Sequence, residues 1–138
     1  MNNKRGLAAE MAIVAMLTVA ALCTVLLVVS RMMQKTATND YTYIVASAET
    51  NQVAEDFVAA LSDENAASFD ENVFKGNHPS FDGFITIDVS AADENADVYT
   101  LSVTHPAGKV AVAVAVRVER AADGSQSSHL VFWRQRII

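Results

Sequence analysis

The pattern of apolar and polar positions divides the chain into three zones. The first is a continuous apolar run from Leu7 to Ser30, LAAEMAIVAMLTVAALCTVLLVVS, which contains no Gly or Pro and one charged residue, Glu10. A helix rises 1.5 Å per residue, so about 20 apolar residues cross a hydrocarbon core of ~30 Å. The run therefore predicts a transmembrane helix over residues 7–30.

The polar leader Met1–Gly6 precedes this run and places Lys4 and Arg5 directly before it. Lys and Arg are enriched on the cytoplasmic side of membrane helices. The leader therefore predicts a cytoplasmic N-terminus and an extracytoplasmic C-terminal domain, although two cations also follow the run. A cleaved secretory signal is the alternative, but its apolar region would be about 7–15 residues long. The small-residue site near Ala20 lies in the middle of the run, which favours retention in the membrane.

The second zone has the period of an amphipathic helix. Residues 31–40 (RMMQKTATND) end in Asn and Asp, which are preferred N-cap residues and indicate a break or restart in this juxtamembrane segment. The alternative is a helix that runs unbroken from Leu7 to Leu61. From 41 to 61, apolar residues recur at helical spacing and predict an amphipathic helix. Its expected buried stripe is Ile44, Ala48, Val53, Phe57 and Leu61, widened by Val45, Ala54 and Val58.

Ser62–Gly83 is predicted to be a loop-rich connection, because Asn, Asp, Ser, Gly and Pro punctuate it. Four apolar residues are expected to plug into the core: Phe69, Val73, Phe74 and Phe81. Asp-Glu-Asn triplets at 63–65, 70–72 and 93–95 lack the spacing of a calcium loop. Solvated turns and helix caps account for them, and no metal site is predicted.

The third zone alternates with a period of two, which is typical of strands. Four strands are predicted, at Phe84–Val89, Val98–Thr104, Lys109–Glu119 and His129–Ile137. In the third strand, the valines from Val110 to Val118 fall on one face, and three alanines and Arg117 fall on the other. The short connections, which include Ala91–Ala96, make neighbouring strands antiparallel.

These zones predict an α+β fold in which an N-terminal transmembrane helix is extended by an amphipathic helix that packs on a four-stranded antiparallel meander. The expected organisation is a basic leader at 1–6, a transmembrane helix at 7–30, a juxtamembrane segment at 31–40 and an extracytoplasmic domain at 41–138. We expect the valine face of the sheet to cover the helix stripe. The alanine face is expected to admit another element or another subunit.

Charge is distributed unevenly along the 138 residues, whose formal net charge is −6. Thirteen acidic residues stand against one base between Asp40 and Asp97, whereas five bases and two acidic residues follow from Val98 onwards. An acidic body argues against nucleic-acid binding, which needs a basic footprint. The asymmetry suits either contact between subunits or a surface that pairs with itself.

No sequence pattern indicates catalysis. His78, His105 and His129 are scattered and lack the neighbouring Cys or His of a zinc site. The chain has no G-x-S-x-G nucleophile motif and no glycine-rich phosphate loop. Its single cysteine, Cys23, lies inside the apolar run, so it forms no intramolecular disulfide, and we interpret it as an inert thiol. The sequence therefore predicts a protein that is not an enzyme and has no cofactor.

Glu10 is the most informative residue of the apolar run. An acidic side chain in the middle of a membrane helix costs about 2.5–3.5 kcal/mol on insertion scales. Glu10 lies about one turn from the polar end of the run. It therefore either reaches back to the membrane interface or finds a cationic partner inside the membrane or inside an assembly.

The stretch KRGLAAEMAIVAML resembles the prepilin signal of type IV pilins and pseudopilins, a basic leader that ends in Gly before an apolar helix with one Glu. It is also similar to the tight-adherence branch of pilin-like proteins. The resemblance implies that a membrane prepilin peptidase cuts after Gly6, and that the new amine of Leu7 pairs with Glu10 of a neighbouring subunit. Glu10 is the fourth residue after Gly6, whereas the family Glu is usually the fifth. One residue turns a helix by about 100° and shortens the reach by ~1.5 Å.

The resemblance implies a structural pilin-like or pseudopilin-like subunit in the cell membrane or in a surface filament. Its partners would be the membrane, other pilin-like subunits and the prepilin peptidase. The alternative is a single-pass membrane protein whose small extracytoplasmic domain binds a partner without forming a filament. A third hypothesis, an anchored enzyme, requires the three histidines to converge in space.

Overall fold

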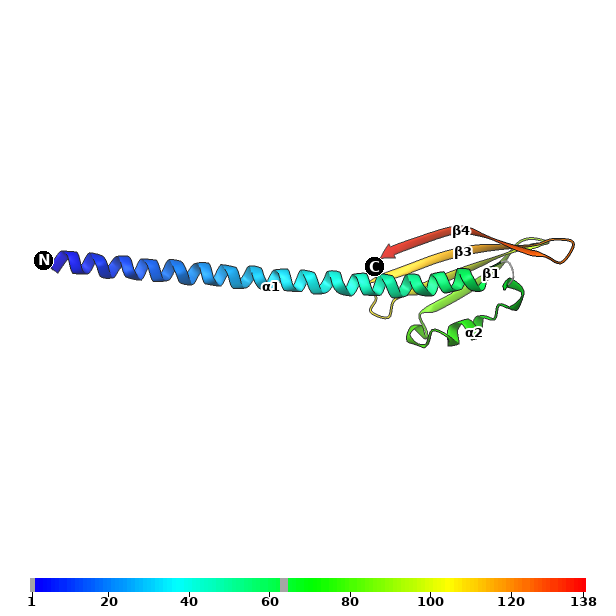
Figure 1. Ribbon diagram of the computed structural model, residues 1–138, viewed down its shortest axis with the longest axis horizontal. Helices are drawn as coiled ribbons and strands as arrows, with labels where there is room; N and C mark the ends of the chain where they lie inside the picture. Colours follow the sequence, from blue (N-terminus) through cyan, green and yellow to red (C-terminus); the bar gives the residue numbers. More distant parts are fainter. Residues whose placement is uncertain (1, 63–64) are drawn as a thin grey trace. The chain divides into compact units, whose positions relative to one another are not determined.

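The computed structural model describes residues 2–62 and 65–138. The chain divides into two compact units, Met1–Tyr41 and Thr42–Ile138, which we call the N-terminal unit and the C-terminal unit. The helix α1, Asn2–Ala60, forms the N-terminal unit and is also the first element of the C-terminal unit (Figure 1). Two residues of the Asp-Glu-Asn triplet at 63–65 lie outside the described residues.

The helix α1 runs through residues 31–40, where the sequence predicts a break. The hydroxyls of Thr36 and Thr38 donate to the carbonyl oxygens four residues before them, at 3.0 and 2.9 Å. Such bonds satisfy the hydroxyl within the helix, so these polar side chains do not compete with the helical backbone. The predicted restart with a cap at 39–40 is therefore wrong.

The C-terminal unit continues with short helical segments and a sheet. The 3-10 turns η1 (Ala66–Ser68) and η2 (Pro79–Phe81) flank the helix α2 (Glu71–Gly76). Four strands follow: β1 (Ile85–Asp93), β2 (Ala96–Thr104), β3 (Val110–Arg120) and β4 (Gln126–Ile137). The carboxylate of Asp70 accepts hydrogen bonds from two backbone amides in the first turn of α2, so the second Asp-Glu-Asn triplet begins with a helix cap, as predicted.

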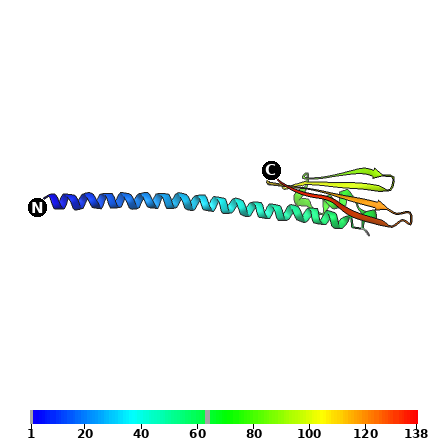
Figure 2. The same ribbon diagram turned by 90° about the horizontal axis from the view of Figure 1, so that it is seen from above.

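The sheet is an antiparallel meander with the strand order β1-β2-β3-β4 (Figures 1 and 2). This confirms the predicted α+β class, a long apolar helix followed by a four-stranded antiparallel sheet. The predicted connection Ala91–Ala96 is wrong, because β1 continues to Asp93 through a bulge and leaves only residues 94–95 between the strands. The strand β4 begins at Gln126 rather than at His129, since the serines between them pair with β3.

The core lies between the valine face of β3 and one face of α1. The valines at alternate positions from Val110 to Val118 are buried, and Leu101 and Val103 continue this layer on β2. Within 46–61, the buried residues are Ala46, Thr50, Val53, Ala54, Phe57 and Leu61. All of them except Thr50 form one hydrophobic cluster with the sheet, which confirms that the valine face packs against this helix.

The first part of the predicted helix stripe is wrong, because Ile44 and Ala48 are exposed. Ala46 and Thr50 face the core instead, at 1% and 0% exposure. The hydroxyl of Thr50 donates to the carbonyl oxygen of Ala46 at 2.6 Å. Burial of a polar side chain is costly unless its hydrogen bonds are satisfied, and this internal bond meets that condition.

Phe57 is the centre of an aromatic cluster. Its ring meets those of Phe69 and Phe74 edge to face, with the ring centroids 5.7 Å apart in both pairs. Phe74 and Phe81 are buried and Phe69 is partly buried, as predicted. The prediction for Val73 is wrong: it is 60% exposed, because adjacent residues of a helix point in different directions and Phe74 takes the core position.

The turn between β3 and β4 contains Asp123 and Gly124, in the segment that the sequence predicts to be a connection. Gly124 has a φ of +87°, a conformation that favours glycine. The backbone amide and hydroxyl of Ser125 donate to one carboxylate oxygen of Asp123, at 2.9 and 2.6 Å. These hydrogen bonds, the hydroxyl first, hold the pKa of Asp123 below its ordinary value.

We expect the substitution Phe57→Ala to lower the free energy of unfolding of the C-terminal unit by about 3–5 kcal/mol, because it removes a fully buried ring and leaves a cavity. Denaturant unfolding of the full chain in detergent, followed by Trp133 fluorescence, measures the change. Val73→Ala is the matched control and should cost less than about 0.5 kcal/mol, since Val73 is exposed. Equal losses for the two variants would contradict this description of the core.

Candidate functional site

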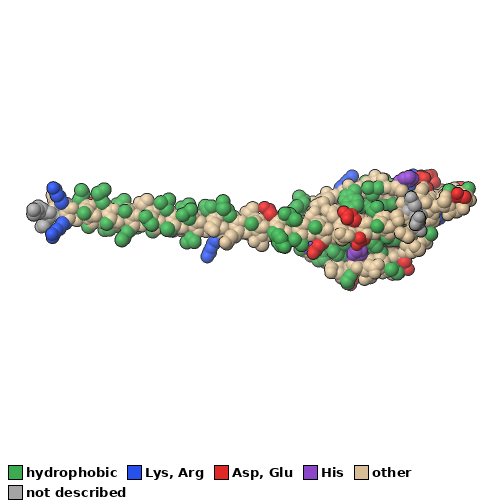
Figure 3. Space-filling model, in the orientation of Figure 1, with side chains coloured by type: hydrophobic (Ala, Val, Ile, Leu, Met, Phe, Trp, Pro, Cys, Tyr) green, Lys and Arg blue, Asp and Glu red, His purple; other side chains and the backbone are tan. Residues whose placement is uncertain are grey.

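The N-terminal unit presents an apolar surface along α1. Its large apolar side chains between Leu7 and Val29 are between 42% and 74% exposed. Figure 3 shows hydrophobic side chains repeatedly along this helix, beyond cationic side chains near its start. Among the described residues, α1 is the one helix that is long and apolar enough to cross a membrane. This agrees with the predicted single-pass anchor.

The predicted processing and assembly residues lie close together at the start of this surface. Gly6, Leu7 and Glu10 are all in α1 and exposed. Apart from its own turns of helix, a Cβ added at Gly6 would meet nothing within 4 Å, so there is open space beside this residue. Leu7 and Glu10 are three residues apart and therefore lie on one side of the helix.

The threonine hydroxyl groups inside the apolar run are satisfied by the helix itself. Thr18 and Thr24 each donate to the carbonyl oxygen four residues earlier, at 2.8 Å. In a hydrocarbon environment an unpaired polar group would cost several kcal/mol. Glu10 is the one charged residue within residues 7–30. Among the described residues, its carboxylate has no such bond to the helix backbone.

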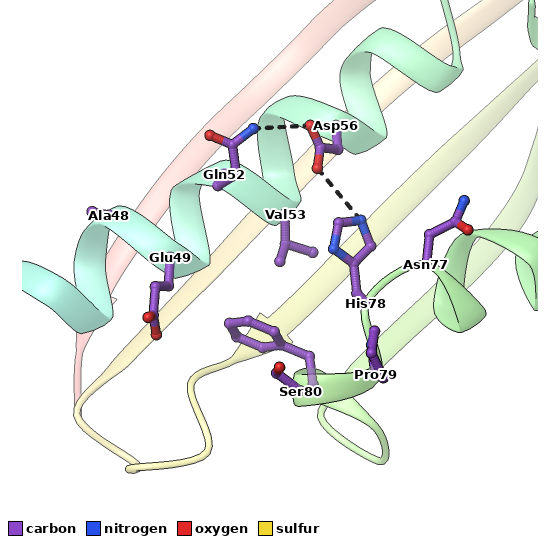
Figure 4. Close-up of a pocket in the computed structure, with 10 residues that line it drawn as sticks. Ala48, Glu49, Gln52, Val53, Asp56, Asn77, His78, Pro79 and Ser80 are labelled. Carbon is purple, nitrogen blue, oxygen red and sulfur yellow. Dashed lines mark hydrogen bonds and ion pairs between the residues drawn. The ribbon is translucent and has the colours of Figure 1, made fainter.

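The C-terminal unit contains a groove beside α1, with a volume of about 600 Å³ (Figure 4). One wall is a face of α1 and the other is the segment that leads into η2. Its lining residues are Ala48, Glu49, Gln52, Val53, Asp56, Asn77, His78, Pro79, Ser80 and Phe81. Figure 4 shows the ring of His78 turned towards Asp56 across this groove.

Two histidine–carboxylate pairs join α1 to the segments around it. Nε2 of His78 lies 3.6 Å from the carboxylate of Asp56, and Nε2 of His105 lies 2.8 Å from that of Glu49. Glu49 and Asp56 are seven residues apart and so lie on one face of α1. The ring of Phe81 packs edge to face against His105, with centroids 5.7 Å apart.

The second nitrogen of His105 defines its hydrogen-bonding role. Its Nδ1 accepts a hydrogen bond from the backbone amide of Ala107 at 3.0 Å. In the neutral ring the proton is then on Nε2, which donates to Glu49. This arrangement ties the β2–β3 turn to α1 and gives His105 a structural role.

The three histidines do not converge on one site. His129 of β4 lies opposite Arg117, on the outer face of the sheet, whereas His78 and His105 contact α1 on the inner side. Within residues 2–62 and 65–138, no group of three or more His, Cys, Asp or Glu side chains is placed to hold a metal ion. The described part of the chain therefore does not bring the three histidines together.

Sequence reasoning missed the carboxylates that bind the two histidines, as well as one amide. Glu49 and Asp56 are seven residues apart, and this spacing could have shown that both carboxylates lie on one face of a helix. It could not have identified their histidine partners, which lie far away in the sequence. Gln135 of β4 hydrogen-bonds Ser47 at 2.8 Å and Asn51 at 3.1 Å on α1. No pattern in the sequence marks this glutamine.

No protein-family model, curated protein or solved structure matches this chain. Function must therefore be argued from the geometry of the two units and from the residues themselves.

A double-mutant cycle between Glu49 and His105 should give a coupling free energy of about 0.5–1 kcal/mol, because the pair is a close hydrogen bond at a partly exposed site. The variants are Glu49→Gln, His105→Ala and their combination, measured by denaturant unfolding of the full chain. The matched cycle between Asp56 and His78 should give a smaller value, since those atoms are 3.6 Å apart. A larger coupling in the second cycle would contradict the assignment.

Proposed function

We propose that this chain is a pilin-like structural subunit, anchored by α1 with its N-terminus in the cytoplasm and its C-terminal unit outside the membrane. It assembles through that helix into a surface filament or a secretion-type pseudopilus. The observation that carries the proposal is Glu10, an exposed carboxylate in the otherwise apolar residues 7–30 of α1. It lies four residues after Gly6, and Lys4 and Arg5 precede that glycine.

Cleavage after Gly6 would change the surroundings of Glu10. In the full chain α1 begins at Asn2, so Glu10 lies in its third turn. After cleavage the helix would begin at Leu7, and Glu10 would lie in its first turn beside a charged amine. The positive end of the helix dipole stabilises a carboxylate there, and the attraction strengthens away from water. Processing would thus lower the cost of placing Glu10 in an apolar environment.

A neighbouring subunit would offer Glu10 a second amine. An unpaired carboxylate in an apolar environment is costly, so pairing between copies favours assembly over isolated helices. The order of elements behind the helix also supports the proposal. An apolar helix, an amphipathic continuation, a loop-rich connection and an antiparallel meander follow the order that the resemblance to pilin-like proteins implies.

The second candidate function is a single-pass membrane protein whose C-terminal unit binds a partner without forming a filament. The groove beside α1 favours it, because the groove is lined by both apolar and polar side chains. His78 closes part of this groove through its contact with Asp56. A partner that binds there would either separate His78 from Asp56 or contact both side chains.

Determination of the mature N-terminus tests the proposed function directly. In cells that carry a prepilin peptidase, mass spectrometry should find a chain that begins at Leu7. Gly6→Leu should leave the leader attached, because it replaces the glycine that the resemblance places before the cut with a bulky side chain. The helix has open space for a Cβ at this position. An intact Met1, or a cut near Ala20, in the unmodified chain would exclude the pilin-like proposal.

The substitution Glu10→Ala should reduce the assembled fraction about tenfold or more while membrane insertion is retained, because it removes the partner of the amine and leaves a more apolar helix. Shearing of cells followed by immunoblotting of filament and membrane fractions measures both quantities. Glu55→Ala is the matched control, since Glu55 is an exposed carboxylate of α1 within the C-terminal unit. If Glu10→Ala and Glu55→Ala assemble alike, the pairing does not operate.

A further inference from the structure

The sheet of the C-terminal unit has two edges that no other described strand pairs. The strand order places β1 at one edge and β4 at the other, on opposite sides of the sheet in Figure 2. Side chains are exposed from Asp88 to Asp93 on β1 and from Leu130 to Ile137 on β4. An edge strand presents a row of backbone N–H and C=O groups that can pair with a strand of another chain.

The two edges carry opposite charges on the outer face of the sheet, which is the face away from α1. The strand registers place Asp88 of β1 and Phe132 of β4 on one row across the sheet, with Arg134 next along β4. Among the described residues, no ion pair forms at Asp88, Arg134 or Arg136. The two arginines of β3, by contrast, bind carboxylates at 2.7–2.9 Å.

Apolar side chains are exposed at both edges on the inner face of the sheet. Val89 of β1 is 55% exposed, and Leu130 and Trp133 of β4 are 53% and 37% exposed. The registers place Val89 and Leu130 on one row. A contact between the two edges would therefore cover apolar surface from both of them.

Strand direction allows these edges to meet without turning either copy over. Neighbouring strands are antiparallel throughout the meander, so β1 and β4 run in opposite directions. A second copy in the same orientation, displaced by the width of the sheet at about 4.8 Å per strand, brings its β1 antiparallel to β4 of the first. The outer faces of the two copies then lie on the same side of the joined sheet. Acidic side chains therefore meet basic ones on that side, and apolar side chains meet on the inner side.

We propose that β4 of one copy pairs with β1 of a second copy, so that the sheets of the C-terminal units continue from copy to copy. With this displacement Phe132 lies opposite Asp88 of the second copy, and Arg134, the next residue of β4 on the same face, is diagonally adjacent to that carboxylate. Each copy uses two different edges, so the contact is heterologous and repeats along a row of copies. It requires neither cleavage after Gly6 nor pairing of Glu10, and it is therefore independent of the proposed function.

Charge selects this pairing over the other edge contacts. Charged side chains often protect an edge strand from pairing, and like charges directly opposite each other are destabilising. Two β4 edges would bring arginines together, and two β1 edges would bring Asp88 near a second Asp88. Only the contact between unlike edges joins opposite charges on this face.

Disulfide formation between two differently tagged full-length copies tests the contact. On a Cys23→Ser background, one copy carries Phe132→Cys and the other carries Thr86→Cys, Asp88→Cys or Ser90→Cys. Directly opposed residues of antiparallel strands have Cα atoms about 4.5–5.5 Å apart, within disulfide range. We expect one of the three positions on β1 to give a mixed dimer in membranes. The matched control is Ser102→Cys, which is exposed on the same face but lies opposite Thr86 on the central strand β2 and should give none.

Charge reversal tests the recognition. Arg134→Glu alone and Asp88→Lys alone should each lower the association of the full chain in detergent severalfold, as measured by sedimentation. The two substitutions in one chain should restore association, because every contact again joins one cation and one anion. Restoration also excludes misfolding as the cause of the single losses.

The outcomes separate this inference from the proposed function. Absence of any mixed dimer, equal cross-linking at Ser102→Cys, or no recovery in the doubly reversed chain would overturn the edge contact. If Glu10→Ala abolishes assembly while the edge variants assemble normally, the edge contact fails and the proposed function stands. If the chain with an unaltered Gly6 keeps its leader in cells that carry a prepilin peptidase, and the mixed dimer still forms, the edge contact stands and the proposed function fails.

Discussion

The packing of α1 on the valine face of β3 is the interaction on which the rest of the C-terminal unit depends. Val110 to Val118 supply one layer of the core, and Phe57 and Leu61 supply the other. The short helices and the turns are then attached to this sandwich by local contacts. Phe69 and Phe74 pack on Phe57, and the histidine pairs hold their segments against α1. Loss of the central packing would leave these peripheral contacts without a surface to bind.

The same helix meets two different requirements along its length. Within the C-terminal unit its apolar face is narrow, because the sheet covers one side and charged residues such as Glu55 remain in water. Within residues 7–30 the apolar side chains point in all directions, and a folded soluble domain cannot leave so much apolar surface in water. A bilayer or neighbouring helices must cover it. Glu10 is the charged residue of this stretch, and under the proposed function its partner is the amine of another subunit.

Local patterns predicted most of the fold, and tertiary contacts explain where prediction failed. The alternation of valines in β3 and the uninterrupted run from Leu7 are properties of single segments, so the sequence reveals them directly. Ile44 was assigned to the core because helical spacing alone does not determine which face meets the sheet. The partnership of Glu49 with His105 joins residues 56 apart, and no local rule finds it. Gly6, Leu7 and Glu10 form a local motif that the sequence alone can suggest, whereas their proposed roles depend on other proteins that a single-chain structure does not contain.

The sequential strand order has a consequence for how the C-terminal unit forms. Every strand pairs only with its neighbours in the chain, and the connection between β1 and β2 is two residues long. Each hairpin can therefore close soon after its own residues become available, with little loss of loop entropy. Docking of α1 on the sheet, by contrast, joins parts of the chain that are far apart in the sequence. During synthesis the helix α1 is made before the strands. We therefore expect the sheet to form hairpin by hairpin, and the core to be completed only after β3 has been made.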